Sequence, residues 1–243
     1  MVPGKERIAK YIAGAGVCSR RQAEEKIRLG LVSVNGQRRD PPAFFVSDSD
    51  KIVVDGQALQ PKEAVRLWLY HKPKGLMTTY KDPQGRKTVF ESLPANMPRV
   101  VSVGRLDLSS EGLLLLTNSG ALAHQLEKPS GGWKRKYRVR IRGALTSEQI
   151  QQLQKGLTID GIRYAPVQIE KDSQQGEGIN QWFTFTLTEG KNREIRKMMD
   201  HFHHPVSRLI RVAYGPFQLG LLPAGAVKEV PSKVIKEQIA CVS

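Results

Sequence analysis

The sequence predicts an α+β protein in two parts, a small module over residues 5–60 and a larger domain over residues 66–243, joined by a linker at residues 61–65. Helical spacing of apolar residues, followed by short hairpin patterns, marks the first part. Strict alternation of apolar and polar residues at 133–142 and 182–187 marks the second part and is typical of half-buried antiparallel strands. Helical patterns lie between such strands, so we expect a largely antiparallel, curved sheet flanked by helices, with a cleft across its middle.

The N-terminal module is expected to contain two helices and a small sheet. Apolar residues fall at helical spacing over residues 8–15, and Ser19 with Gln22 three residues later predicts a capping box for a second helix. Valines alternate with a polar residue before the Asn35-Gly36 turn, and the apolar run 52–54 ends at another turn. These elements predict a compact module of two layers.

Charge and composition indicate the class of partner. Lysine and arginine number 38 against 23 acidic residues, which gives a net charge of +15. Such an excess favours a polyanionic partner, but charge alone does not distinguish RNA from DNA or an acidic membrane. Two cysteines argue against a disulfide scaffold and a cysteine-rich zinc site, and they fit a reducing cytoplasm. No apolar run approaches the roughly 20 residues that span a bilayer, so we expect a cytoplasmic protein with no membrane partner.

The stretch Gly104–Asp107 comes just before Leu113–Leu116, a leucine run short enough for a buried strand. Arg105 and Asp107 are therefore expected on the loop that enters a core strand, where catalytic groups are often found. An arginine two residues from an aspartate favours an ionised, nucleophilic carboxylate. A turn or cap role for Asp107 is the alternative that this local pattern leaves open.

Two parts of the chain resemble known families. Gly104–Asp107, with Gly112 and the leucine run behind it, resembles the active-site motif of the RsuA-like ribosomal pseudouridine synthases. Residues 16–24 and 30–36 resemble, in order and spacing, the S4 RNA-binding domain, which implies binding of structured RNA through its shape and phosphates. Arg20-Arg21 lies in the first turn of the second helix, where a bound phosphate would offset an unfavourable helix dipole; a solvated helix face is the alternative.

Residues 133–142 form the clearest predicted strand. One face carries lysine and arginine, including Arg138 and Arg140, and the other carries Tyr137 and apolar residues. The cationic face could line an RNA groove. Pattern alone favours core packing for Tyr137, whereas the resemblance identifies it with the family's active-site tyrosine, which implies that it stacks on an extruded base.

Residues 189–199 predict a helix that Asn192 caps and that packs through an apolar stripe. Arg193 and Arg196 share another face, as they would on any amphipathic helix. The resemblance implies more, namely that Arg196 pairs with the catalytic carboxylate of Asp107, because a planar guanidinium can hold a carboxylate through two hydrogen bonds.

The activity that the resemblance implies is site-specific isomerisation of uridine to pseudouridine in ribosomal RNA, with the large subunit favoured. The sequence has no phosphate-binding loop and no dinucleotide motif, so we expect no cofactor, and we expect a monomer. Asp107 is then the essential group, and it attacks C1′, stabilises positive charge there, or acts after proton removal at C2′; the sequence leaves these routes open. Tyr137 and Arg196 complete the implied catalytic set. Arg105 is implied to fill the space that the extruded nucleotide leaves.

The residues expected to contact RNA are basic and exposed. Pro73 and Gly75 predict a turn that exposes the two lysines beside them. The full set is Arg105, Arg20, Arg21, Lys10, Lys72, Lys74, Arg138, Arg140, Lys191 and Arg193.

Two other functions compete with this prediction. A non-catalytic ribosomal-RNA-binding or ribosome-assembly factor could keep the fold, but binding alone does not need the set Asp107, Tyr137 and Arg196. A DNA-binding protein could use the N-terminal helix pair, but no base-reading helix is evident after Arg21. The histidines near residue 203 lack a carboxylate or cysteine at ligand spacing, so no metal site is expected.

Overall fold

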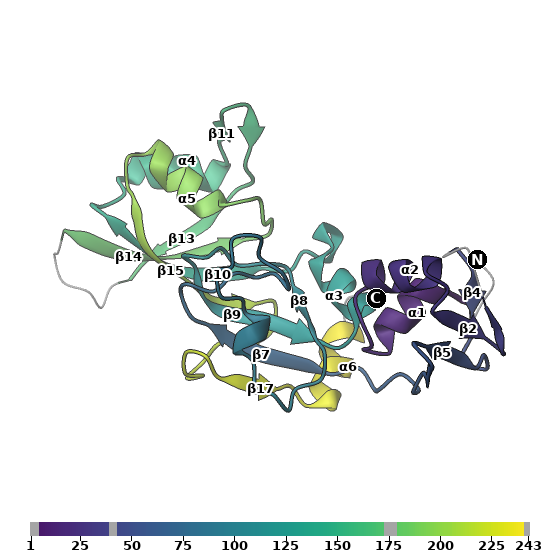
Figure 1. The fold of residues 1–243 in the computed structure, drawn as a ribbon. Helices are drawn as coiled ribbons and strands as arrows, with labels where there is room; N and C mark the ends of the chain where they lie inside the picture. Colours follow the sequence, from purple (N-terminus) through teal and green to yellow (C-terminus); the bar gives the residue numbers. More distant parts are fainter. Residues whose placement is uncertain (1–4, 39–42, 173–178, 241–243) are drawn as a thin grey trace. The chain divides into compact units, whose positions relative to one another are not determined.

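The computed structural model describes residues 5–38, 43–172 and 179–240 (Figure 1). The chain divides into two compact units. The first unit holds the residues up to Arg66 together with two short segments, Asn96–Val101 and Asn118–Gly120, and the second unit holds the rest. Each unit has its own core of buried apolar side chains.

The first unit consists of two helices and a small antiparallel sheet, as the sequence predicted. The helices are α1 (Ile8–Gly14) and α2 (Arg20–Arg28), and the main sheet has the strand order β3-β2-β5-β6. Ser19 and Gln22 form the predicted capping box, in which the Gln22 amide donates to the Ser19 hydroxyl at 3.2 Å. The strands are β1 (Glu6–Arg7), β2 (Val32–Val34), β3 (Gln37–Arg38), β4 (Phe45–Val46), β5 (Ile52–Val54) and β6 (Gln57–Ala58).

The segment predicted as a linker packs in part on the first unit. The Lys62 ammonium lies 2.6 Å from a carboxylate oxygen of Glu6 and 4.0 Å from the centre of the Tyr11 ring. These contacts tie residue 62 to the N-terminal helix and to the strand before it.

The second unit is built on a nine-stranded sheet with the order β13-β14-β10-β15-β9-β7-β17, to which β16 is added at β15 and β8 at β9. Strands β9 and β15 run parallel, while the neighbours from β13 to β15 and from β9 to β17 run antiparallel, so the largely antiparallel sheet is confirmed. The strands are β7 (Leu67–Lys72), β8 (Val101–Val103), β9 (Glu111–Thr117), β10 (Arg135–Arg142), β13 (Gln168–Lys171), β14 (Asn180–Leu187), β15 (Val206–Tyr214), β16 (Phe217–Gln218) and β17 (Val227–Glu229), with a separate hairpin of β11 (Thr158–Ile159) and β12 (Ile162–Arg163).

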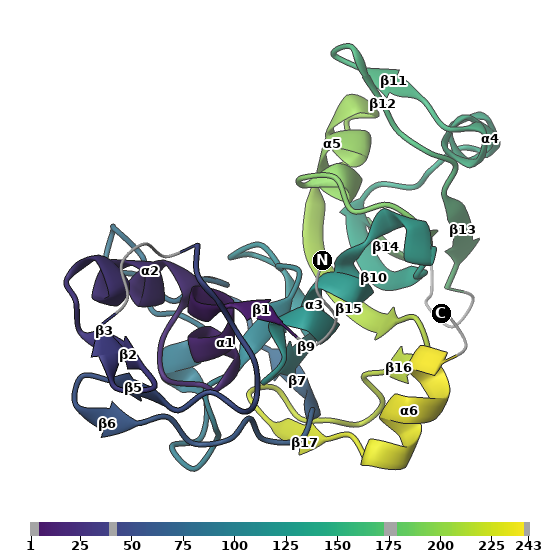
Figure 2. The same cartoon turned by 90° about the vertical axis from the view of Figure 1, so that its right-hand side faces the viewer.

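Helices lie beside both ends of this sheet. Helices α4 and α5 lie near β13, β14 and β10, whereas α6 lies beside β16 and β17 (Figures 1 and 2). The helices of this unit are α3 (Gly120–Glu127), α4 (Ser147–Lys155), α5 (Glu194–His201) and α6 (Ser232–Ala240), with short 3-10 helices at Phe90–Ser92 and Pro129–Gly131. Within the described ranges, no helix is long and apolar enough to cross a lipid bilayer.

Burial follows the sequence pattern strand by strand. The run Leu113–Leu116 is fully buried, so both faces of β9 are covered. In β10 only one face is buried, and its Val139 and Ile141 pack with Phe183 of β14 and Met198 of α5. The loop between β8 and β9 therefore leads directly into a strand that is fixed on both faces, which gives the Asp107 segment a rigid base.

Candidate active site

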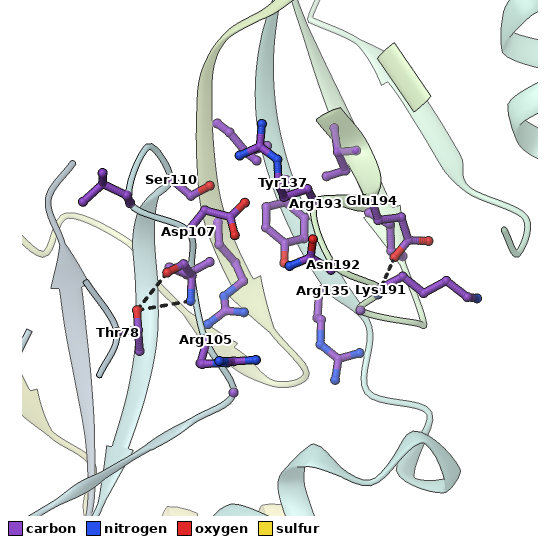
Figure 3. Close-up of a pocket in the computed structure, with 18 of the residues that line it drawn as sticks. Thr78, Arg105, Asp107, Ser110, Arg135, Tyr137, Lys191, Asn192, Arg193 and Glu194 are labelled. Carbon is purple, nitrogen blue, oxygen red and sulfur yellow. Dashed lines mark hydrogen bonds between the residues drawn. The ribbon is translucent and has the colours of Figure 1, made fainter. Parts of the chain in front are cut away.

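A pocket of about 640 Å³ opens on the second unit around Asp107. Its walls come from the β8–β9 loop, the start of β10, the second half of β15, and the turn between β14 and α5. Asp107 and Tyr137 face each other from two of these walls (Figure 3). The lining residues that bear on the chemistry are Arg105, Asp107, Glu127, Arg135, Tyr137, Glu189, Lys191, Asn192, Arg193, Glu194, Arg211 and Tyr214.

Asp107 lies on the β8–β9 loop, where the leucine run predicted it. The loop is fixed by Thr78, whose hydroxyl donates to the Leu106 carbonyl at 2.8 Å, and by the Gly104 amide, which donates to Glu127 at 2.6 Å. The Asp107 carboxylate is partly buried and accepts no hydrogen bond from any residue that the structure describes. It is therefore a pocket carboxylate that is available to a substrate.

Tyr137 lies on the buried face of β10 and reaches the pocket from there. It packs against the core formed by Val139 and its neighbours, yet it is only partly buried and lines the pocket. Across the β10–β15 pairing it lies directly opposite Arg211. The two alternatives for Tyr137, core packing and a pocket position, are thus both realised in one side chain.

Lys72 is buried, whereas the sequence analysis predicted an exposed lysine that contacts RNA. Strand β7 continues through Lys72, and the side chain is 0% exposed. Its ammonium donates to the carbonyls of Pro73 (3.1 Å), Asp107 (3.1 Å) and Ser110 (2.8 Å). Burial lowers the pKa of Lys72 to about 8, against the opposing attraction of Asp107 and Glu111. Lys72 therefore supports the active-site loop from inside, whereas Lys74 is exposed as expected.

Arg196 is buried, as a partner of the site should be, but it does not pair directly with Asp107. Its Nη1 donates to the Val206 carbonyl and its Nη2 to the Ser109 carbonyl, each at 3.2 Å. Burial and the charge of Arg193 lower the pKa of Arg196, while the charge of Asp107 works in the opposite direction. The predicted ion pair is replaced by a hydrogen bond to the backbone two residues after the carboxylate.

Arg211 is the pocket residue that sequence reasoning missed. It is 3% exposed, lines the pocket and donates through Nε to the Leu113 carbonyl at 2.7 Å. Its guanidinium carbon lies 5.2 Å from the centre of the Tyr214 ring. The signal was present in β15, where Arg211 falls in the buried alternation of Leu209 and Ala213. A charged residue at a core-facing position of a strand indicates a site residue or a structural partner.

The turn between β14 and α5 forms the remaining wall. Arg193, rather than Asn192, immediately precedes the helix, and its φ of 51° places it in the left-handed region. Asn192 therefore does not cap α5, and the Lys191 amide is instead bonded to the Glu194 carboxyl at 3.0 Å. This conformation leaves Lys191, Asn192 and Arg193 exposed along the pocket.

Arg138 and Arg140 lie outside the pocket, on the cationic face that the sequence predicted, and contact of that face with RNA stays a prediction. Alternation along β10 places them on the opposite face from Tyr137. Arg138 is bonded to Asp172 at 2.7 Å and lies 4.8 Å from the centre of the Trp182 ring. Arg140 is exposed on that same face.

The basic residues predicted in the first unit lie on its helices. Lys10 pairs with Glu6 at 2.8 Å, and Arg20 pairs with Glu24 at 3.3 Å. Arg21 is exposed in the first turn of α2, as expected. Throughout the described parts of the chain, no group of three histidine, cysteine or acidic side chains could hold a metal ion.

Comparison with known proteins gives a family match in each part of the chain. Residues 66–201 match the RNA pseudouridylate synthase family, and residues 6–52 match the S4 domain. An uncharacterized RNA pseudouridine synthase of Rickettsia typhi is 49% identical, over 96% of this chain and 95% of the relative. The ribosomal large subunit pseudouridine synthase B of Yersinia pestis is 42% identical, over 94% of this chain and 73% of the relative.

A solved structure shares the fold. The crystal structure of a pseudouridylate synthase superposes with a TM-score of 0.67 and 23% identity, over 96% of this chain and 99% of that one. The family match covers the residues that carry Asp107, Tyr137 and the turn before α5. The chain therefore belongs to the RNA pseudouridylate synthase family and carries an S4 domain before its catalytic part.

Proposed function

We propose that this enzyme isomerises a specific uridine of ribosomal RNA in the large subunit to pseudouridine, with Asp107 as the catalytic carboxylate. The choice of ribosomal RNA is supported by the name of the Yersinia pestis relative and the extent of its identity. The S4 domain supports a structured RNA substrate.

The catalytic assignment rests on which of the pocket carboxylates already accept a hydrogen bond from the protein. Glu127 accepts from the Gly104 amide, Glu189 from the Ala165 amide, and Glu194 from the amide of Lys191. Asp107 alone among the pocket's acidic side chains has no hydrogen bond to a described residue. A carboxylate that the protein leaves unoccupied can act at the sugar of a bound nucleotide.

The reaction breaks the N1–C1′ bond, turns the uracil and forms a C5–C1′ bond. The C5 hydrogen leaves as a proton and N1 takes up a proton, so substrate and product are isomers. Asp107 acts at the sugar while the bond to the base is broken, and Tyr137, on the facing wall, stacks on the extruded uracil. Arg196 keeps the Asp107 loop in place through Ser109 and has no direct bond to the carboxylate.

RNA binding is assigned to basic residues on the pocket wall and on the first unit. Arg105, Lys191 and Arg193 are exposed and line the pocket, where they can contact phosphates on either side of the extruded nucleotide. Arg105 is also placed to fill the space that the nucleotide leaves. Lys74 on the second unit and Lys10, Arg20 and Arg21 on the first extend the proposed contacts.

Release of tritium from RNA that carries 5-³H-uridine tests the assignment, because the C5 hydrogen leaves only when pseudouridine forms. We expect the wild-type enzyme to release tritium from large-subunit ribosomal RNA and Asp107→Asn to lose about 10³-fold or more in kcat, the scale seen when an essential catalytic group is removed. RNA binding should persist, because the substitution does not remove a cation. Normal turnover by Asp107→Asn would refute the role of Asp107.

A further inference from the structure

Glu194 is a buried acidic residue whose carboxyl group has too few hydrogen-bond donors around it to stabilise a negative charge. It is 5% exposed at the first residue of α5. One carboxyl oxygen accepts from the Lys191 amide at 3.0 Å, but the other, Oε1, is buried and accepts no hydrogen bond from a described donor. A buried carboxylate oxygen without a donor is costly, because it has lost its water and gained no partner.

Glu189 supplies the missing partner if Glu194 carries a proton. The two carboxyl groups are neighbours through Lys191, whose amide donates to Glu194 and whose ammonium contacts Glu189. Glu189 also accepts from the Ala165 amide at 2.7 Å and from the Lys191 ammonium. Two adjacent carboxyl groups cannot both ionise at low cost, and Glu189 has the better donors. A proton shared by this pair would therefore reside on Glu194, where its hydroxyl could donate to Glu189.

The electrostatics of the pair agree with this arrangement. Burial, followed by the neighbouring Glu189, raises the pKa of Glu194 to about 8, against the effect of Lys191. Burial also acts to raise the pKa of Glu189, but hydrogen bonds from Glu194, Ala165 and Lys191 outweigh it and lower that pKa. The lower pKa of Glu189 makes it the ionised partner.

The strands β11 and β15, which pack on α5, contribute no further carboxyl group. Strand β11 contributes Thr158 and Ile159, neither of which ionises in this range. Strand β15 contributes two arginines, of which Arg208 is bonded to Glu111 and Arg211 to the Leu113 carbonyl. The turn and α5 itself also carry charged or titratable side chains, namely Lys191, Arg193, Arg196, Lys197, Asp200 and His201.

We propose that Glu194 is a positioning residue of the active site, held as a neutral carboxylic acid that donates to Glu189 and so closes the turn at residues 189–194. This turn presents Lys191 and Arg193 on the pocket wall, and the helix that follows carries Arg196, which holds the Asp107 loop. Loss of the Glu194 proton would place two carboxylates side by side and open the turn. The effect on turnover rests on the proposed function, whereas the protonation state does not.

The raised pKa of Glu194 determines how the stability of the folded protein changes with pH. The pKa of Glu194 is about 8 in the folded protein, above its ordinary value of 4.5, so the folded protein keeps a proton that the unfolded chain gives up. The stabilising contribution of the pair is therefore complete below about pH 4.5 and is lost as the pH rises to about 8. Above that range RNA turnover should also decline.

Substitution Glu194→Gln tests the proposal, because an amide keeps the donor and cannot ionise. The melting temperature is measured by calorimetry between pH 5 and 9, and kcat and KM for tritium release are measured over the same range. We expect the wild-type melting temperature to fall relative to Glu194→Gln between pH 5 and 8, and the alkaline decline of kcat/KM to move at least one pH unit higher in the variant. Glu148→Gln, an exposed acid on α4, is the matched control and should keep the wild-type pH dependence.

Each result decides one part of the proposal. Parallel melting curves for wild type and Glu194→Gln between pH 5 and 8 would show that Glu194 is ionised and would overturn it. Different melting curves with an unchanged kcat/KM profile would refute the positioning role. If the melting curves differ and no RNA is turned over, the proposed function fails while the neutral Glu194 stands. Should Glu194→Gln not fold, Glu189→Gln replaces the charged acceptor and should move the pH dependence of melting to lower pH; an unchanged dependence would overturn the proposal.

Discussion

At the scale of single residues, three buried cations hold the segment that carries Asp107. Lys72 donates to the Asp107 and Ser110 carbonyls, Arg196 to the Ser109 carbonyl, and Arg211 to the Leu113 carbonyl. A charged donor that is out of water makes a strong hydrogen bond to a carbonyl. The position of the proposed catalytic carboxylate is therefore set by side chains from β7, α5 and β15.

Lys72→Met tests this support at the residue most deeply buried. Loss of the ammonium leaves buried carbonyls without a donor, so we expect the free energy of unfolding to fall by about 3 kcal/mol. The kcat should fall more than KM rises, because the loop is displaced while the RNA-binding residues remain. Urea unfolding and steady-state kinetics measure both effects.

Lys74→Met, at an exposed lysine two residues away, is the matched control: the free energy of unfolding and kcat should stay near the wild-type values, and only KM should rise, because a proposed RNA contact is lost. The pH dependence adds a second check. The pKa of Lys72 is about 8 in the folded protein against 10.5 ordinarily, so the unfolded chain binds more protons between these values. Wild-type stability should therefore rise relative to Lys72→Met from pH 8 to 10.5. If Lys72→Met and Lys74→Met gave the same free energy of unfolding and the same kcat, the role of Lys72 would be contradicted.

The residues of the site were only partly predictable. Asp107 and Tyr137 lie where the leucine run and the strand alternation indicated. Lys72 was expected on the surface and Arg196 in contact with the carboxylate, because a sequence shows a cation but not the backbone carbonyls that will surround it. Arg211 was not assigned for the same reason, since its neighbours in the pocket come from distant parts of the chain.

At the scale of elements, the parallel pairing of β9 with β15 brings the backbones of these two strands unusually close together. The β8–β9 loop that carries Asp107 leads directly into this pairing. Gly112 pairs with Arg211, and its φ is +101°. A Cβ atom at Gly112 would lie 2.3 Å from the Arg211 carbonyl oxygen. Because backbone atoms cannot move aside as a flexible side chain can, only glycine permits this approach.

Gly112→Ala should therefore destabilise the enzyme far more than an alanine at an unobstructed glycine. Gly85 has a φ of +67° and no atom within 4 Å of the added Cβ, so Gly85→Ala isolates the cost of the backbone conformation. We expect Gly85→Ala to cost about 1 kcal/mol and Gly112→Ala about 3 kcal/mol or more in the free energy of unfolding. Urea denaturation of both variants measures the difference, and equal losses would contradict the close-approach account.

Elements were predicted better than their arrangement. Alternation and the leucine run identified β10, β14 and β9 because each pattern reflects burial of one or both faces of a strand. The parallel pairing of β9 with β15 was not predictable, since it joins segments about a hundred residues apart with no local signal. The start of α5 was misplaced because the strained Arg193, and not Asn192, precedes it.

At the scale of the whole molecule, the net charge of +15 indicated a polyanionic partner but not the surface that meets it. The structure separates the basic residues of the second unit into two groups. Arg193 lines the pocket, whereas Arg140 lies on the opposite face of β10 from Tyr137. We therefore expect the first group, rather than the second, to contact the RNA on either side of a nucleotide that enters the pocket.

Arg193→Asn and Arg140→Ala test this division. Asparagine removes the charge of Arg193 and tolerates its left-handed conformation. We expect Arg193→Asn to weaken binding of a short stem-loop substrate and to lower the slope of log K against log salt by about 1, as loss of one phosphate contact does. Arg140→Ala should leave both unchanged on this short substrate. Filter binding at several salt concentrations measures the slopes, and a larger effect of Arg140→Ala would reverse the assignment.

Carbodiimide mapping of ribosomal RNA is the most direct test that Asp107 drives a uridine isomerisation. RNA is taken from a strain that lacks the gene and from the same strain complemented with wild type or with Asp107→Asn. We predict that the deletion removes one pseudouridine from the large-subunit RNA, and that wild type restores it but Asp107→Asn does not. Restoration by Asp107→Asn, or an RNA that is unchanged by the deletion, would contradict the account.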